Sequence, residues 1–321
     1  MAHLIVKNFG AIKSAEIEIK KYNFFIGHTS SGKSTIAKLL AIFNNSVFWA
    51  IKEGDFKGFF KLLEKYNINF DFKPSTIIKY SNDKYYWEIG ENKFHSNYKD
   101  ADLMEMASTS ESYDFILKFI EKKESESSLK DLIDALKNSV KDSKLKKDDT
   151  FFPLFIKPLL MSIIYEECIP VYIPAERLLI STFSNSIFSL LQAGASIPDC
   201  IKDFGSLYEK ARTQYKNIDI DILNIQVSFN NNGDTIYLTN EHKELKLSQA
   251  SSGIQSIIPL WTVFNQYVES KKKQMLVIEE PELNLFPSTQ HFLIDWIIKK
   301  MRKSNIELLR IVLIIMVIAH H

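Results

Sequence analysis

The sequence contains little glycine and cysteine, with 10 glycines and two cysteines among 321 residues. Neither Cys168 nor Cys200 has the paired spacing of a metal site, and two cysteines do not make a disulfide framework. We therefore expect reduced cysteines in an intracellular protein. Because glycine is scarce, the position of each one is informative, and Gly27 and Gly32 lie only five residues apart.

A charge imbalance and a long apolar segment are also absent. The formal net charge is +1, so overall charge does not indicate nucleic acid or a membrane surface as a partner, although it leaves room for a local basic patch. The first residues, MAHLIVKNFG, lack the apolar core of a signal peptide. The apolar run at 311–319 is shorter than the roughly 20 residues that cross a bilayer. We therefore expect a cytoplasmic protein that contacts no membrane.

The two close glycines frame the segment GHTSSGKS, which fits the phosphate-loop pattern G-x-x-x-x-G-K-[ST]. Backbone N–H groups of such a loop wrap the phosphates, so side chains must stay out of the way. Lys33 is expected to reach the β- and γ-phosphates, and the Ser34 hydroxyl is the expected Mg²⁺ ligand. An apolar strand precedes the loop, and an amphipathic helix follows with its N-terminus toward the anion. The predicted nucleotide-binding residues are Gly27, His28, Thr29, Ser30, Ser31, Gly32, Lys33 and Ser34.

Two carboxylates, Glu279 and Glu280, stand at the end of an apolar strand. Groups at the carboxyl end of a parallel strand point into the crevice that also holds a phosphate loop. One carboxylate can belong to the Mg²⁺ shell, and the next can orient and polarise the attacking water. The sequence therefore indicates a nucleotide-hydrolysing site.

Apolar residues recur with strand period over 3–9 and 15–19 and with helix period after the phosphate loop. Two continuously apolar strands near the end, separated by a helix, are typical of a parallel sheet covered on both faces. The charged segment 101–149 has helical spacing. Further strands are expected at 76–80, 85–89, 171–174, 225–229 and 235–238, and the region 178–224 is expected to be mostly helical.

Four segments, in order LIVKNFGAIKSAEIEI, IGHTSSGKST, SSGIQS and VIEEPELNLFP, resemble the ABC-type ATPase heads of the SMC and RecF superfamily. Within it, the chain looks most like the overcoming-lysogenisation-defect (OLD-like) group of AAA-labelled bacterial ATPases. The resemblance implies ATP and Mg²⁺ as cofactors and Thr35 as part of Walker A. It also implies that Glu279, where most relatives have aspartate, holds Mg²⁺ with Ser34. Glu280 matches the catalytic glutamate, and Lys33 is its partner in catalysis.

The segment SSGIQS resembles the signature motif, with Ser252, Gly253 and Gln255 at matching positions and Ile254 where transporter ATPases usually have glycine. A serine and a glycine that open a helix make an anion-binding N-terminus, although a plain helix cap needs the same residues. In ABC heads this helix tip faces the γ-phosphate bound by the other protomer. The resemblance therefore implies a homodimer that forms on ATP binding.

The resemblance also sets the domain organisation and the expected end of the head. We predict an α/β P-loop NTPase with a mostly parallel sheet core, an antiparallel N-terminal β lobe and a helical insertion. Relatives end a late strand with a Thr/Ser-His pair, and here Ala319-His320 takes that place. Either His320 is the switch histidine, which makes it a candidate catalytic residue, or the tail is cut or frame-shifted. The parts are 1–43 (N-terminal β lobe and Walker A), 44–170 (β-hairpin and helical insertion) and 171–321 (signature, Walker B and switch).

The segment VYIPAER places Glu176 and Arg177 just after a strand. Related ATPases often show a similar Pro-Ala-Glu-Arg segment. Arg177 could approach the nucleotide or a partner, but a surface ion pair is the simpler expectation.

We expect an Mg²⁺-dependent ATPase whose heads dimerise around two ATP molecules. The alternative is a nucleotide-gated binding or scaffold module with little hydrolysis. A monomeric P-loop kinase or GTPase fits less well, because SSGIQS and EEPE match neither and no Asn-Lys-x-Asp motif is present. The resemblance further suggests work linked to DNA, in repair or phage defence, with DNA or an effector protein as partner.

Overall fold

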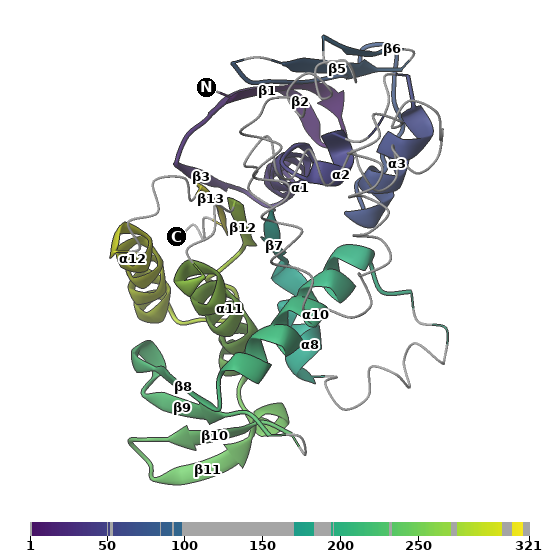
Figure 1. Cartoon of the computed structure of the whole chain (residues 1–321). Helices are drawn as coiled ribbons and strands as arrows, with labels where there is room; N and C mark the ends of the chain where they lie inside the picture. Colours follow the sequence, from purple (N-terminus) through teal and green to yellow (C-terminus); the bar gives the residue numbers. More distant parts are fainter. Residues whose placement is uncertain are drawn as a thin grey trace, which may run out of the picture.

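The computed structural model describes residues 2–49, 51, 54–83, 85–91, 93–97, 170–182, 194, 196–230, 233–270, 275–303 and 310–316. These residues form an α/β fold with one parallel and two antiparallel sheets (Figure 1). The helical insertion predicted over 101–149 lies outside the described residues. None of the helices in the described part combines the length and apolar composition needed to cross a membrane.

The first antiparallel sheet has the strand order β2-β1-β4-β5-β6. The predicted strands over 3–9 and 15–19 are confirmed, and Leu4 of the first pairs with Ile17 of the second. The predicted hairpin is also confirmed, and its first strand pairs with β1, so the hairpin and the N-terminus share one sheet. The strands are β1 (Ala2–Phe9), β2 (Ile12–Ile19), β4 (Ile77–Ser81), β5 (Tyr86–Gly90) and β6 (Lys93–Ser96).

The parallel sheet has the order β3-β13-β12-β7, so β13 lies between the strand before the phosphate loop and the strand that ends in Glu279. Its two central strands are the continuously apolar ones, as expected for a sheet covered on both faces. Leu276, Val277 and Ile278 are fully buried. The strands are β3 (Tyr22–Gly27), β13 (Arg310–Met316), β12 (Met275–Glu279) and β7 (Val171–Ile173).

Helix α1 (Lys33–Phe43) begins at the residue predicted from the phosphate-loop pattern and lies between the parallel sheet and the first antiparallel sheet (Figure 1). Its apolar side chains, including Ile36 and Leu40, are buried. Phe43 stacks on Tyr80 of β4 with ring centroids 4.9 Å apart, which joins the helix to the antiparallel sheet. The helix ends at Asn44, whose side chain donates to the carbonyl of Leu40.

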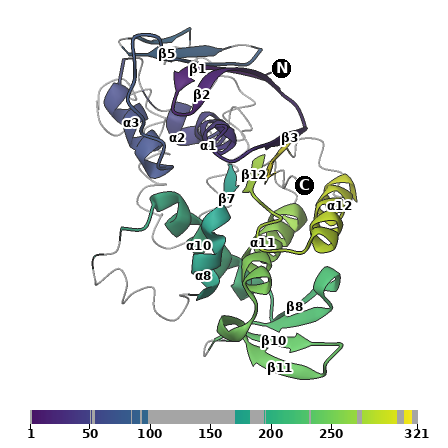
Figure 2. The ribbon, with the colours of Figure 1, turned by 180° about the vertical axis from the view of Figure 1, so that it is seen from behind.

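The other face of the parallel sheet is covered by helices, and the second antiparallel sheet lies beyond them (Figure 2). Trp261 and Trp296 stack with centroids 3.5 Å apart and hold α11 (Ser252–Glu269) and α12 (Pro287–Lys303) together. This sheet has the order β11-β10-β9-β8. Its strands are β8 (Asn217–Ile220), β9 (Ile225–Ser228), β10 (Thr235–Leu238) and β11 (Lys243–Lys246). The remaining helices are α2 (Ser46–Trp49), α3 (Phe56–Lys65), α8 (Leu178–Thr182), α10 (Asp199–Gln214), α11 (Ser252–Glu269) and α12 (Pro287–Lys303), with 3₁₀ turns η2 (Ala175–Arg177), η3 (Asp221–Leu223) and η4 (Leu247–Gln249).

The expectation that 178–224 is mostly helical is correct for α8 and α10 but wrong for β8, because residues 217–220 pair with β9. Ile218 and Ile220 alternate with polar residues and are buried on one face of that pair. Residues 217–220 therefore form a strand because they pair with β9, although helix α10 precedes them closely in the chain.

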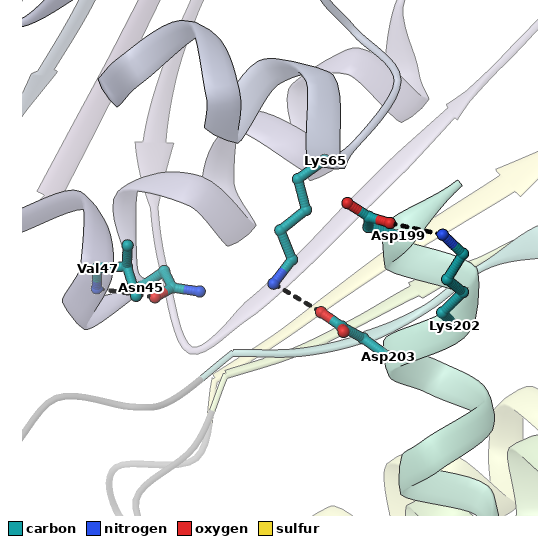
Figure 3. A network of polar contacts seen from close by, with 6 residues as sticks. All are labelled: Asn45, Val47, Lys65, Asp199, Lys202 and Asp203. Carbon is teal, nitrogen blue, oxygen red and sulfur yellow. Dashed lines mark hydrogen bonds and ion pairs between the residues drawn. The ribbon is translucent and has the colours of Figure 1, made fainter. Parts of the chain in front are cut away.

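Two parts of the chain that are distant in sequence also meet through a polar contact (Figure 3). Lys65 at the end of α3 forms an ion pair of 2.6 Å with Asp203 of α10. Next to it, Lys202 pairs with Asp199 within the first turns of α10. On the side of α2, the Asn45 side chain accepts a hydrogen bond from the Val47 N–H. Partly exposed pairs of this kind contribute little to the free energy of unfolding.

Candidate nucleotide site

The phosphate-loop segment connects the end of β3 to the start of α1 at the carboxyl edge of the parallel sheet. Gly32, directly before α1, has φ 91°, in the left-handed region that favours glycine. A Cβ atom on Gly32 would also lie 2.5 Å from Ile12 Cγ1 of β2. Glycine is therefore required there both by the backbone conformation and by the packing of the loop on the first sheet.

The Lys33 side chain lies back across its own loop. Its Nζ atom donates to the carbonyl oxygens of Gly27 at 2.7 Å and His28 at 2.6 Å, and to Ser31 Oγ at 3.4 Å. An ammonium group has three donors, and all three face loop oxygens. A charged phosphate is a stronger partner than a neutral carbonyl. The loop therefore holds Lys33 where a phosphate could take over its hydrogen bonds.

The N-terminus of α1 has the features of an anion site. Because Gly32 has no side chain, no side-chain cap forms there, and the first-turn N–H groups lie at the positive end of the helix dipole. Thr35 of the first turn is buried against the fold. The exposed side chains of the loop are His28, Thr29, Ser30 and Ser31. Together with the glycine-framed backbone, this arrangement suits a phosphate chain.

Glu279 ends β12 with its side chain almost fully buried. Burial raises the pKa of the Glu279 carboxyl, while Lys38 and the nearby hydroxyls of Tyr172 and Ser34 favour its charged form. Among the described residues, Glu279 Oε1 has no hydrogen-bond partner. A buried acceptor of this kind is costly unless something pairs with it.

Ser34 and Glu279 fit a magnesium ion. Mg²⁺ prefers hydroxyl, carboxylate and phosphate oxygens, and these two side chains come from α1 and β12 beside the phosphate loop. A cation there would pair with the unsatisfied Oε1 and offset the cost of the buried charge.

Glu280 follows directly and has φ 43°, which is uncommon for a residue with a side chain. This left-handed conformation costs about 1–2 kcal/mol. The Glu280 carbonyl accepts from the N–H of Leu283 at 3.0 Å and from Arg177 Nη2 at 2.7 Å. The strained turn redirects the chain after the strand, so the half-buried Glu280 side chain does not continue the alternation of β12.

The signature segment forms the start of α11. Ser251 is the N-cap, and its side chain accepts from the Ile254 N–H at 3.5 Å, so the plain helix cap weighed from the sequence is present. Ser251 and Ser252 are exposed, so the tip of this 18-residue helix faces outward. Gly253 is buried, and a Cβ atom there would lie 2.6 Å from the Asn284 carbonyl oxygen. Gly253 therefore lets the helix pack tightly on the turn that follows Glu280.

Gln255 was predicted to bind nucleotide, and the structure places it inside the subunit. Its Nε2 donates to the carbonyls of Ala250 at 2.9 Å and Ser248 at 3.2 Å, and its Oε1 accepts from Thr182 Oγ1 at 3.0 Å. These bonds fix the path of the chain into α11. A contact between Gln255 and nucleotide stays a prediction.

The prediction that Arg177 forms a surface ion pair is wrong, because its side chain is fully buried. Its guanidinium donates to main-chain carbonyls of Pro174, Ser256 and residues 279–281. Burial lowers its pKa to about 10, although Glu282 and other nearby carboxylates oppose that shift, so it stays charged at neutral pH. The sequence showed an arginine directly after the short strand β7. No pattern near that strand shows that β7 pairs with β12, so the burial of Arg177 could not be predicted.

Two predicted features lie outside the described residues: His320, the candidate switch histidine, and Cys168. Cys200 is a buried free thiol, and burial raises its pKa to about 11. β13 is confirmed as a strand up to Met316.

Comparison with known proteins gives one family. A family model described as AAA ATPase domain matches residues 1–174 and 52–312. No match was found among curated proteins.

Several solved structures have a distantly similar arrangement. An Smc head bound to the C-winged helix domain of ScpA is 9% identical, covers 98% of this chain and 89% of its own, and has a TM-score of 0.41. An Smc head with an extended coiled coil from Pyrococcus furiosus is 12% identical, covers 99% of this chain and 90% of its own, and has a TM-score of 0.39. The dimeric, ADP- and Pi-bound ATP-binding cassette MJ0796 is 11% identical, covers 98% of this chain and 88% of its own, and has a TM-score of 0.35.

Proposed function

Because the chain belongs to the AAA ATPase domain family, we propose that it binds ATP with Mg²⁺ and hydrolyses it to ADP and phosphate in a head-to-head dimer. The observation that carries this proposal is the glycine-framed loop with Lys33 held across it, next to the buried Glu279. Closer membership of the OLD-like group is a further part of the proposal and rests on the resemblance alone.

Each residue near the loop has a defined task in this proposal. The α1 N–H groups and Lys33 hold the phosphates, and Lys33 exchanges the Gly27 and His28 carbonyls for phosphate oxygens. Ser34 and Glu279 hold Mg²⁺, which when bound neutralises charge on the phosphates.

Glu280 orients the attacking water and accepts its proton during in-line attack on the γ-phosphorus. The turn held by Leu283 and Arg177 carries Glu280 directly after β12. Its φ of 43° is backbone strain of the kind found at functional sites.

The dimer is proposed because a second anion-binding helix tip faces outward. Ser251 and Ser252 are exposed at the start of α11, while Gly253 and Gln255 of its first turn are buried, and the Ser251 side chain accepts from the Ile254 N–H alone. In the proposed dimer, this tip contacts the γ-phosphate held by the loop of the partner subunit. ATP then becomes part of the interface, so dimerisation depends on nucleotide.

Phosphate release with ATP and Mg²⁺ tests hydrolysis. Lys33→Ala should abolish it, while Lys13→Ala, which removes an exposed lysine on β2, should leave it unchanged. If wild type and Lys33→Ala release phosphate equally slowly while ATP raises the melting temperature of wild type alone, the protein is a nucleotide-gated binding module and not an ATPase.

Light scattering after size exclusion tests the dimer. Glu280→Gln should bind ATP without turnover and accumulate as a dimer, and Glu244→Gln on the exposed face of β11 is the matched control. A Glu280→Gln variant that hydrolyses normally and stays monomeric with ATP would contradict the assignment.

We also propose, from the resemblance, that the ATPase cycle serves DNA repair or phage defence together with DNA or an effector protein. Stimulation of phosphate release by duplex DNA, with a polyanion such as heparin as the control, tests the DNA part. Equal release with and without DNA would remove that part and leave the ATPase proposal in place.

A further inference from the structure

Arg177 is a buried cation that binds only main chain. In the described part of the chain it takes part in no ion pair, and its five hydrogen bonds all go to carbonyl oxygens. Nearby carboxylates, Glu282 foremost, oppose the lowering of its pKa by burial, yet every hydrogen bond of the guanidinium goes to main chain, so its geometry serves the segments that it joins.

The five bonds connect three segments. Arg177 Nε donates to the Ser256 carbonyl in the first turns of α11 at 3.0 Å. Nη1 donates to the Glu279 carbonyl at 2.8 Å, and Nη2 donates to the Glu280 carbonyl at 2.7 Å. The remaining two bonds, each 3.2 Å, reach the carbonyls of Pro174 and Pro281. One rigid planar group therefore ties the signature helix to the strained turn at Glu280.

Neighbouring contacts strengthen this connection. Ser181 Oγ, one turn beyond Arg177, donates to the Gln255 carbonyl at 2.7 Å and is itself buried. Gly253 packs against the Asn284 carbonyl so closely that a methyl group would not fit. The start of α11 and residues 279–284 are thus fastened together by a hydrogen-bonded fork and by direct main-chain packing.

We propose that Arg177 is a positioning residue that couples the tip of α11 to the main chain of Glu280, and so couples the two nucleotide sites of a dimer. This inference rests on the proposed function: there, the α11 tip of one subunit contacts the nucleotide of its partner, while Glu280 acts on the nucleotide of its own subunit. Occupation of one site fixes α11. Arg177 transmits that position to the Glu280 turn, so the second site reaches its productive geometry only after the first is filled.

Lysine cannot replace this group. Its ammonium is a single point with three donors on a flexible stem, so it cannot reach the Ser256 carbonyl and the 279–281 carbonyls in a fixed geometry. Arg177→Lys keeps the charge and most of the buried volume. A loss of coupling in this variant is therefore due to the lost hydrogen-bond geometry and not to a missing side chain. Arg302→Lys, on the exposed end of α12, is the matched control.

The experiment measures phosphate release against ATP concentration together with binding of a fluorescent ATP analogue. Wild type should show positive cooperativity. Arg177→Lys should keep nucleotide affinity, lose cooperativity and lower kcat at least about tenfold, as expected when a catalytic group is misplaced by a fraction of an ångström. A residue that only supports the fold would lower affinity, kcat and melting temperature together.

Each outcome decides between the two proposals. No turnover in wild type overturns the ATPase proposal and the coupling with it. Turnover without cooperativity in wild type, or unchanged cooperativity and kcat in Arg177→Lys, overturns the coupling alone. If Arg177→Lys does not fold, Ser181→Ala decides, because it removes the hydroxyl that donates to the Gln255 carbonyl while Arg177 stays in place. It should reduce cooperativity with intact affinity, and unchanged cooperativity would overturn the coupling.

Discussion

Gly32→Ala tests the phosphate loop most directly, because two independent costs can be worked out for it. Its φ of 91° is left-handed, and placing a Cβ atom there costs about 1–2 kcal/mol. The new atom would meet Ile12 Cγ1 at 2.5 Å, and overpacking of this kind costs a further 1–3 kcal/mol, roughly. We therefore expect the variant to be about 2–5 kcal/mol less stable without nucleotide.

Gly54→Ala separates the two costs. Gly54 has φ 82°, and a Cβ atom there meets nothing within 4 Å, so this substitution carries the backbone cost without the clash. The difference between the two variants, measured by urea denaturation at 25 °C, should be about 1–3 kcal/mol. Only Gly32→Ala should also lose binding of a fluorescent ATP analogue, since only its loop must move.

A double-mutant cycle supplies the refuting result. Ile12→Ala removes the atom that clashes and alone costs about 2–5 kcal/mol. Combined with Gly32→Ala, the two changes should cost less than the sum of the single variants, because the new methyl group occupies the vacated space. Additive losses, or a Gly32→Ala variant no less stable than Gly54→Ala, would show that the loop does not pack on Ile12 as described.

Three further predictions follow from the charged and reactive groups. Burial raises the pKa of Glu279, so apo wild type loses stability as pH rises from the ordinary value of 4.5 through the raised one. Apo Glu279→Gln should therefore melt higher than wild type at neutral pH, with the gap closing toward pH 4.5, yet gain no stability from Mg²⁺–ATP. Alkylation followed by peptide mapping should find Cys200 unreactive at pH 8 in folded protein and reactive in urea, because its pKa is about 11. Asp203→Ala should change the unfolding free energy by no more than about 1 kcal/mol, since its ion pair with Lys65 is partly exposed, and a larger loss would mean that this contact holds the lobes together.

The glycine-framed loop before α1 and the sheet strands were readable from the sequence because their signals are local. The spacing of Gly27, Gly32 and Lys33 lies within one loop and predicted the start of α1 correctly. The apolar run before Glu279 predicted a buried strand, and β12 is buried along its whole length. Strand β8 was missed because four residues carry too little periodic signal beside a 16-residue helix.

The sequence by itself determined the glycine-framed loop, the parallel strands beside it and the two carboxylates at their edge. Neighbouring residues set both the backbone conformation and the pattern of buried side chains in these segments. Only the tertiary structure decided what Arg177 does. Apart from Pro174, its carbonyl partners lie 79 to 104 residues further along the chain, so no pattern near Arg177 contains them. They come together because β7 pairs with β12 and α11 packs alongside, which is a consequence of closing the whole core.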